Sequence, residues 1–219
     1  MGGAVTGRKF TTYVLMMGIM YMVNEPRAGA DTIDTTGQEP YEQCGYCHEY
    51  DGNPLMSDFP RLAGQSRTYI VKQLKDFRSG LRKGRMTATA EMLNDQDIET
   101  VAHYFNQQAP RSKELPAQAR QEADKARLMY LQGDPGRGIT ACATCHGQAG
   151  QGVGDIPKLA GQHDVYLAKQ LTEFRSGQRI NDAGGQMRKI VTDLNDEEIR
   201  ILAGYLARLS AVVTVEAPR

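Results

Sequence analysis

Two short cysteine motifs are the residues of this 219-residue chain that are best suited to chemistry. CGYCH occupies residues 44–48 and CATCH occupies residues 142–146, and together they contain all four cysteines. Two cysteines separated by two residues and followed at once by histidine are typical of covalent attachment of c-type haem. Each thiol adds to one haem vinyl group, and the histidine is placed to ligate the iron. The spacing therefore predicts two covalently bound haem c groups, on Cys44, Cys47 and His48, and on Cys142, Cys145 and His146.

Three other uses of paired cysteines fit this pattern less well. A C-x-x-C redox pair normally lies between a strand and a helix of a βαβ unit, and neither copy follows a strand-like run. A zinc site of four cysteines needs no histidine at the fifth position, and its two halves would lie 98 residues apart. A disulfide framework is common in exported chains, but it leaves both histidines unexplained.

The second axial ligand of each iron is expected to be a methionine, which is a common partner of histidine in electron-carrying cytochromes. Met187 is the only methionine after the second motif, so it is the candidate for the second haem. Met56, Met86 and Met92 all follow the first motif within its own half of the chain. The motif alone leaves these three open.

An internal repeat ranks the three methionines. Residues 60–82 align with residues 157–179 at an offset of 97, and 14 of the 23 positions are identical, so the chain is a duplicated module. Met86 and Met187 each lie eight residues before the asparagine of a second repeated segment, LNDQDI in one copy and LNDEEI in the other. Met86 is therefore the predicted ligand of the first haem. Met92 is the main rival although it aligns with an aspartate, and Met56 precedes the repeat.

Two further histidines and two prolines have weaker claims to a role. His103 and His163 have no histidine counterpart in the other copy, and we expect a helix-face residue and a loop or helix-start residue. Pro60 and Pro157 follow the motif histidines by 12 and 11 residues. A loop at such a proline can offer a backbone carbonyl to the imidazole N–H and so fix the ring; a plain turn is the alternative.

Helices are expected to position these groups, since no alternating strand pattern of useful length occurs. Residues 66–79 and 164–176 have helical spacing and are each followed by glycine. Asn94 and Asn195 are predicted N-caps, with acidic residues behind them that suit the positive end of a helix dipole. The apolar stripes behind these caps are Ile98, Val101, Ala102 and Phe105, and Ile199, Leu202, Ala203 and Leu206. The predicted fold is all-α, with two tandem cytochrome c domains that each wrap around a covalent haem.

The N-terminus has the pattern of a secretory signal peptide. Arg8 and Lys9 precede an apolar run at residues 13–23, and residues 28–30 form an A-x-A cleavage site. The run is shorter than the ~20 residues of a membrane span, so cleavage after Ala30 and a periplasmic location are predicted, with an uncleaved anchor as the alternative.

The predicted organisation is a signal peptide (1–30), a first cytochrome c domain (31–108), a linker (109–116) and a second cytochrome c domain (117–219). The linker is polar and proline-containing, and a helix from about residue 116 to residue 131 should open the second domain. Export removes three basic residues and one acidic residue from 26 of each, which leaves a formal charge of −2. A nucleic-acid partner is not expected, because it usually requires a strong basic excess.

The two CxxCH motifs, PRLAGQ and PKLAGQ, the paired KQLxxFRSG segments and the methionines before LNDxxI together make the chain resemble the dihaem cytochrome c4 family. The resemblance covers nearly all of the mature chain. It implies two all-α domains whose His/Met-ligated haems lie close together across a pseudo-twofold interface. One departure is EYDGNPLMSD after the first motif, where the family more usually has a glycine-led segment; Glu49 and Met56 should alter the surroundings of the first haem.

These observations predict an exported electron carrier between a respiratory donor and a terminal oxidase or reductase, with redox proteins as its partners. Membrane association is expected only through a partner or an uncleaved signal. An enzyme is not expected, because two saturated irons leave no open position, and a cysteine-ligated catalytic haem would need a fifth cysteine. The alternative is the electron-accepting subunit of a dehydrogenase complex, of the flavocytochrome sulfide dehydrogenase or alcohol dehydrogenase type. A dihaem peroxidase or thiosulfate-oxidising enzyme ranks below it.

Overall fold

In a computed structural model of the chain, residues 1–2, 37–111 and 120–210 are described. The predicted signal peptide beyond its first two residues, its cleavage site and most of the predicted linker lie outside these ranges. By its internal contacts the chain divides after Gly37, and the fold below belongs to the unit from Gln38 onward. Within the described ranges, no helix is both long and apolar enough to cross a membrane.

The described part of the chain is all-α and repeats one arrangement of helices. Strand pairing there is limited to two isolated bridges. The first half, residues 37–111, contains α1 (Pro40–His48), α2 (Arg67–Arg78), α3 (Met86–Glu91) and α4 (Asp95–Gln107). The second half, residues 120–210, contains α5 (Arg120–Gln132), α6 (Ala143–His146), α7 (Asp164–Arg175), α8 (Gln186–Val191) and α9 (Asp196–Arg208), with short 3₁₀ turns at Pro135–Arg137 and Ala183–Gly185.

The ends of α2 and α7 agree with the predicted starts and stops. The hydroxyl of Ser66 accepts a hydrogen bond from the Tyr69 N–H and so caps α2. His163 takes the same position before α7 without a side-chain cap bond. Gly80 and Gly177 follow the two helices with φ of 75° and 74°, a conformation that glycine adopts without steric cost.

Both asparagine caps are present, and each forms a complete capping box. Asn94 and Asn195 accept from the third helical N–H of α4 and α9, and the acidic side chains of Asp97 and Glu198 accept from the asparagine N–H groups. The apolar stripes predicted behind them are buried on both helices. These two helices therefore supply the centre of each half.

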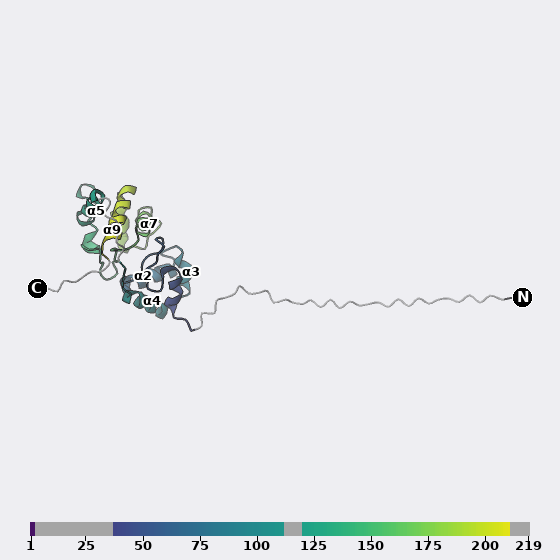
Figure 1. Ribbon diagram of the computed structural model, residues 1–219. Helices are drawn as coiled ribbons and strands as arrows, with labels where there is room; N and C mark the ends of the chain where they lie inside the picture. The colour runs from purple at the N-terminus through teal and green to yellow at the C-terminus, as the bar shows by residue number, and fades with distance from the viewer. Residues whose placement is uncertain (3–36, 112–119, 211–219) are drawn as a thin grey trace. The chain divides into compact units, whose positions relative to one another are not determined.

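Each half has its own apolar core. One core joins α1, α2 and α4 around Phe105, and the other joins α5, α7 and α9 around Tyr130. Figure 1 shows α2, α3 and α4 grouped together, and α5, α7 and α9 grouped together. The helix predicted to open the second half is found as α5, within the described part of that range. The predicted domain boundaries stay a prediction.

Candidate haem-binding sites

The first motif lies on a short helix that ends at its histidine. Pro40 begins α1, where its missing N–H costs nothing, and His48 is the last residue. The buried His48 ring has Nδ1 2.9 Å from the carbonyl oxygen of Pro60. Since a carbonyl only accepts, Nδ1 carries the proton, and Nε2 is left with a free lone pair.

The second motif repeats this geometry with different surroundings. Cys142 precedes α6, and the buried His146 ends it. The Nδ1 atom of His146 lies 3.0 Å from the carbonyl oxygen of Pro157. The prediction that the proline loops orient the imidazoles is confirmed in both halves, so two rings are held with Nε2 available to a metal.

The protonation of these groups suits a covalent haem. Burial lowers the pKa of both His48 and His146, against the opposing effect of the carbonyl each ring contacts, so the imidazoles are neutral at pH 7. Burial also raises the pKa of the Cys44 and Cys142 thiols to about 11. Neutral sulfur fits a thioether, whereas a zinc site would need thiolates.

The competing uses of the cysteines find no support in the described residues. All four cysteines are free thiols there. Nor do three or more histidine, cysteine or acidic side chains gather into a metal-binding group within the described ranges. The donor set in each half is therefore two thiols, one buried neutral imidazole and a nearby apolar core, and this set fits a haem c.

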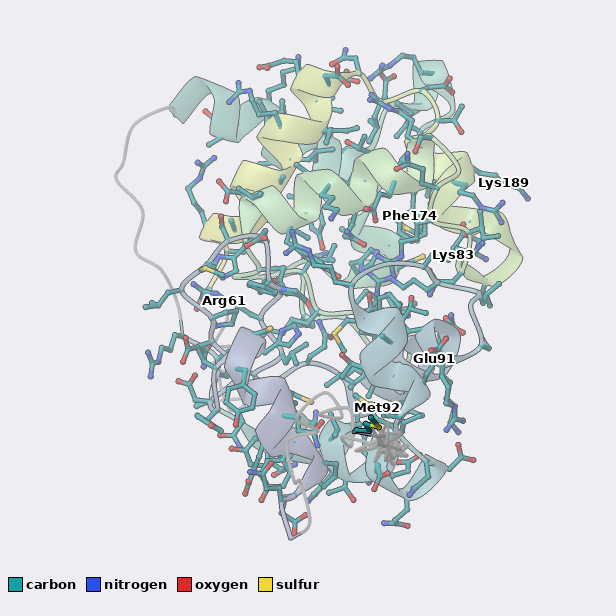
Figure 2. All side chains as sticks on the ribbon, turned by 90° about the vertical axis from the view of Figure 1, so that its right-hand side faces the viewer. Arg61, Lys83, Glu91, Met92, Phe174 and Lys189 are labelled. Carbon is teal, nitrogen blue, oxygen red and sulfur yellow. The ribbon has the colours of Figure 1, made fainter. Side chains whose placement is uncertain are left out.

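The four candidate methionines differ in how far they are buried. Met86 begins α3 and packs against the core cluster that contains Cys44. Met187, in the first turn of α8, packs in the same way against the second core, alongside Cys142. Met92 is 69% exposed and lies at the surface beyond α3 (Figure 2). Met56 is 59% exposed. Of these four candidates, Met86 and Met187 are the two that occupy equivalent, core-facing positions.

The two remaining histidines are placed as predicted, but one has a further role. His103 lies on the exposed face of α4. His163 precedes α7 and is buried, with Nε2 2.9 Å from the carbonyl oxygen of Pro54 in the first half. This contact joins the halves, and nothing in the local sequence pattern indicates it.

The halves are also joined by the glutamines of PRLAGQ and PKLAGQ. The Nε2 of Gln65 donates to the backbone carbonyl of Lys158 (3.0 Å), and the Oε1 of Gln65 accepts from the backbone N–H of Lys158 (2.9 Å). Gln162 does the same with Arg61, at 3.0 Å and 2.8 Å. Arg61 accordingly lies where the first half meets the second (Figure 2). These four hydrogen bonds, two from each glutamine to the backbone of the other half, are called the clasp below. The repeated motif itself does not predict this role.

Comparison with known proteins places this geometry among dihaem cytochromes. The family model described as Cytochrome c matches residues 134–210. Cytochrome c4 of Azotobacter vinelandii is 34% identical over 215 residues, which cover 92% of this chain and 99% of that protein. A protein of Stutzerimonas stutzeri named as a thiosulfate dehydrogenase electron acceptor is 40% identical over 172 residues, covering 76% of this chain and 78% of that protein.

The three-dimensional likeness extends over both halves. The crystal structure of reduced recombinant cytochrome c4 from Pseudomonas stutzeri superposes with a TM-score of 0.73 and 35% sequence identity. The match covers 78% of this chain and 97% of that one. The duplicated arrangement of helices and the packing of one half against the other are thus shared with a solved structure.

Proposed function

Because this chain belongs to the cytochrome c4 family, we propose that it is an exported carrier that passes electrons from a respiratory donor to a terminal oxidase or reductase. As a member of this family it has two cytochrome c domains with covalently bound haem c, and it is an electron-transfer protein, not an enzyme. Beyond what family membership shows, we propose the donor, the acceptor and the periplasmic location of this protein.

We assign the first haem to Cys44 and Cys47, with His48 and Met86 on its iron. The second haem is assigned to Cys142 and Cys145, with His146 and Met187 on its iron. The bound irons would supply one-electron oxidation and reduction at each site. The observation that carries the proposal is the pair of buried imidazoles, each oriented by a proline carbonyl in a half whose core also holds a methionine.

The protein's own contribution would be to fill the coordination positions of both irons that the haem leaves open. Each imidazole is fixed in one tautomer by its proline carbonyl, so the ring needs little reorganisation when the charge on the iron changes. Met86 and Met187 would each supply a second protein ligand, which would exclude water and small molecules from the metal. Methionine ligation also raises the reduction potential, which favours acceptance of electrons.

The second candidate function is electron acceptance from one particular dehydrogenase. It is favoured by the relative named as a thiosulfate dehydrogenase electron acceptor. In that role the donor would be a thiosulfate dehydrogenase, and the onward acceptor could remain the same. Stopped-flow reduction of the oxidised protein by a thiosulfate dehydrogenase, compared with reduction by a quinol-oxidising complex, distinguishes the two candidates by rate.

The ligand assignment is tested with a matched pair of methionine variants. The protein is made in a host that matures c-type haem, and a pyridine haemochrome assay should give two haems per chain. Met86→Ala should lose about half of the sulfur-to-iron charge-transfer absorption and bind carbon monoxide at one haem, and Met187→Ala should do the same at the other. Met92→Ala should leave the spectrum unchanged. Loss of the band in Met92→Ala, or its retention in Met86→Ala, would overturn the assignment.

A further inference from the structure

The surface beside the first haem motif exposes four large apolar side chains within a short stretch of chain. Tyr46 and Tyr50 are 72% and 53% exposed, and Leu55 and Met56 are exposed as well. Single exposed apolar residues are ordinary, whereas a group of them on one surface marks an interaction site. Tyrosine and methionine are also among the residues enriched in the cores of protein interfaces.

These side chains belong to the motif helix and to one closed loop that follows it. The carbonyl of Gly52 accepts from the N–H of Leu62 at 2.9 Å. Together with the 2.9 Å contact between His48 and the carbonyl of Pro60, this bond closes the loop of residues 49–60 at its base. Leu55 and Met56 therefore lie on a loop whose two ends are both attached next to the motif.

The apolar side chains flank the point at which we assign attachment of the first haem. Cys47 is exposed, whereas its counterpart Cys145 is partly covered. The ring of Tyr50 lies against the backbone of Gly45 inside the motif, where an added Cβ would be 2.6 Å from the ring. A partner that covered these tyrosines would therefore come close to the first haem.

Carboxylates without a basic partner border this surface. Residues 38–60 contain five acidic side chains and no lysine or arginine. Asp51 and Asp58 form ion pairs with arginines from elsewhere in the first half. Glu39, Glu42 and Glu49 form no ion pair with the part of the chain that the structure describes, and the first and last of them are exposed. Three negative charges are thus left uncompensated.

The negative charge acts on its surroundings. Partial burial, followed by the charges of Glu39 and Glu42, raises the pKa of Tyr41, which is the response expected beside carboxylates. Below, the name acidic face refers to the four apolar side chains and the three unpaired carboxylates together. Its members are Glu39, Glu42, Tyr46, Glu49, Tyr50, Leu55 and Met56.

The surface around the second motif has a different character. At the offset of the two motifs, Tyr46 and Tyr50 correspond to Thr144 and Gln148. Residues 136–157, the matching stretch, contain one basic and one acidic side chain, so their charges cancel. The acidic face is therefore a feature of the first half that duplication of the module does not explain.

Glu49 keeps its place in this face despite an unfavourable backbone conformation. Its φ of 58° and ψ of 152° are nearly the values of Gly147, which follows the second motif. Strained residues are concentrated at functional sites, where a side chain is needed in spite of the strain. A carboxylate at a position suited to glycine thus points to a use for its charge.

We propose that the acidic face docks a redox partner protein that presents lysine or arginine side chains around an apolar centre. Opposite charges would steer the encounter, and the apolar side chains would be covered in the complex. Transient redox complexes bury little area, so four large side chains are enough for the centre of such an interface. One electron would pass between the first haem and the partner, and no bond or proton would change place in this chain. The inference rests on the function proposed above and adds the class of partner.

The test measures electron transfer with two probes of opposite charge. The basic probe is mitochondrial cytochrome c, a lysine-rich protein, with zinc in place of iron. Flash excitation makes its zinc porphyrin a reductant, and decay of the excited state reports transfer of one electron to the oxidised protein. The anionic probe is ferricyanide, which takes one electron from the reduced protein in a stopped-flow experiment.

Loss of the carboxylates should change the two rates in opposite directions. With Glu39→Gln, Glu42→Gln and Glu49→Gln combined, the rate constant for the basic probe at low ionic strength should fall on the order of tenfold, the low end for electrostatic steering. The rate constant for ferricyanide should rise. Glu49→Gln alone should slow the basic probe roughly twofold, the share of one charge among three. Glu91→Gln, which removes an exposed carboxylate at the end of α3 (Figure 2), is the matched control and should change neither rate.

The apolar part of the face is tested by exchange for the residues of the second half. Tyr46→Thr and Tyr50→Gln should each slow transfer with the basic probe and leave the ferricyanide rate unchanged, because a small ion does not need the covered surface. Val153→Thr, which alters an exposed apolar side chain near the second motif, is the control and should change neither rate.

Two results would overturn the acidic face as the docking surface. One is a rate with the basic probe that does not fall as the ionic strength rises, since salt screens exposed charges. The other is an equal response of Glu49→Gln and Glu91→Gln. A larger effect of Asp155→Asn, near the second motif, would place docking on the second half and would also contradict the proposal.

A further measurement applies if the combined variant does not retain two haems. The unmodified protein is then compared with the basic probe before and after acetylation of the probe's lysines, which should slow transfer; an unchanged rate would contradict the proposal. An unmodified protein that exchanges electrons with neither probe would count against the carrier function itself. Haem content and the sulfur-to-iron band report failure of the haem assignment separately.

Discussion

Glu49 shows how one residue distinguishes the two haem motifs. Among the described residues it is the only non-glycine with a positive φ, at 58° with ψ 152°. Gly147 takes the equivalent place after the second motif with φ 80° and ψ 156°. This region of backbone conformation is nearly restricted to glycine, so Glu49 is strained. The sequence departure after the first motif therefore has a conformational cost.

We expect Glu49→Gly to stabilise the haem-loaded protein by about 1 kcal/mol, because strain of this kind costs ~1–3 kcal/mol and glycine returns part of that as chain entropy. Denaturant unfolding, followed by haem absorbance, measures the free energy. Gly147→Ala is the matched control and should destabilise, since its φ of 80° is a conformation that strains any residue with a Cβ. A less stable Glu49→Gly would show that the turn is not strained.

At the scale of elements, the first turn of α9 has more stabilising contacts than the first turn of its counterpart α4. Glu198 completes the capping box of α9 and also accepts two hydrogen bonds from Arg137, at 2.7 Å and 3.2 Å. Asp97 in α4 completes a capping box, without an ion pair to the described residues. Burial would raise the pKa of Glu198, but Arg137 and the Asn195 N–H hold it below its ordinary value.

Glu198→Gln should destabilise the protein by about 1 kcal/mol at pH 7, which is less than the ~1.5–3 kcal/mol of a hydrogen bond to a charged group because Arg137 is 37% exposed and solvent screens the pair. The carboxylate is favoured in the folded state, so its contribution is complete above the ordinary glutamate pKa of ~4.3 and is lost as the pH falls through the lowered folded value. Urea unfolding at pH 7 and below pH 4 should show the difference shrink. A difference that persists in acid, or a larger loss in the control Asp97→Asn, would contradict this account.

For the molecule as a whole, the clasp made by Gln65 and Gln162 should couple the unfolding of the two halves. Each glutamine pairs with both the N–H and the carbonyl of one residue in the other half. Loss of one side chain removes two hydrogen bonds and leaves two backbone groups without these partners. At ~1 kcal/mol for each bond, the cost is about 2 kcal/mol.

Gln65→Leu and Gln162→Leu should each broaden or split the thermal transition of the haem-loaded protein in differential scanning calorimetry. Gln107→Leu, on an exposed position of α4, is the control and should leave a single transition. If the glutamine variants unfold in one transition at an unchanged temperature, the clasp does not couple the halves, and contacts such as His163 to Pro54 would have to do so.

Much of this protein is determined by local sequence. The attachment motifs depend on a five-residue spacing, and the helix ends depend on caps such as Ser66 and Asn94 that act within one turn. The orientation of His48 was predictable because proline follows both motif histidines at a similar distance. Because the two halves are repeats, a residue assigned in one half indicates its equivalent in the other. Met86 was preferred to Met92 because it is the equivalent of Met187.

Only the tertiary structure decided what the buried polar residues contact. Gln73, Arg82 and their repeat equivalents are identical in both copies, and that identity at polar positions was the available signal of a shared role. Their partners in the other half nevertheless lie 84–110 residues away along the chain. Helix periodicity and capping act over a few residues, whereas these bonds form only when two finished modules dock. Sequence by itself therefore determined two haem modules, and the packing of one module on the other decided which buried polar side chains meet between them.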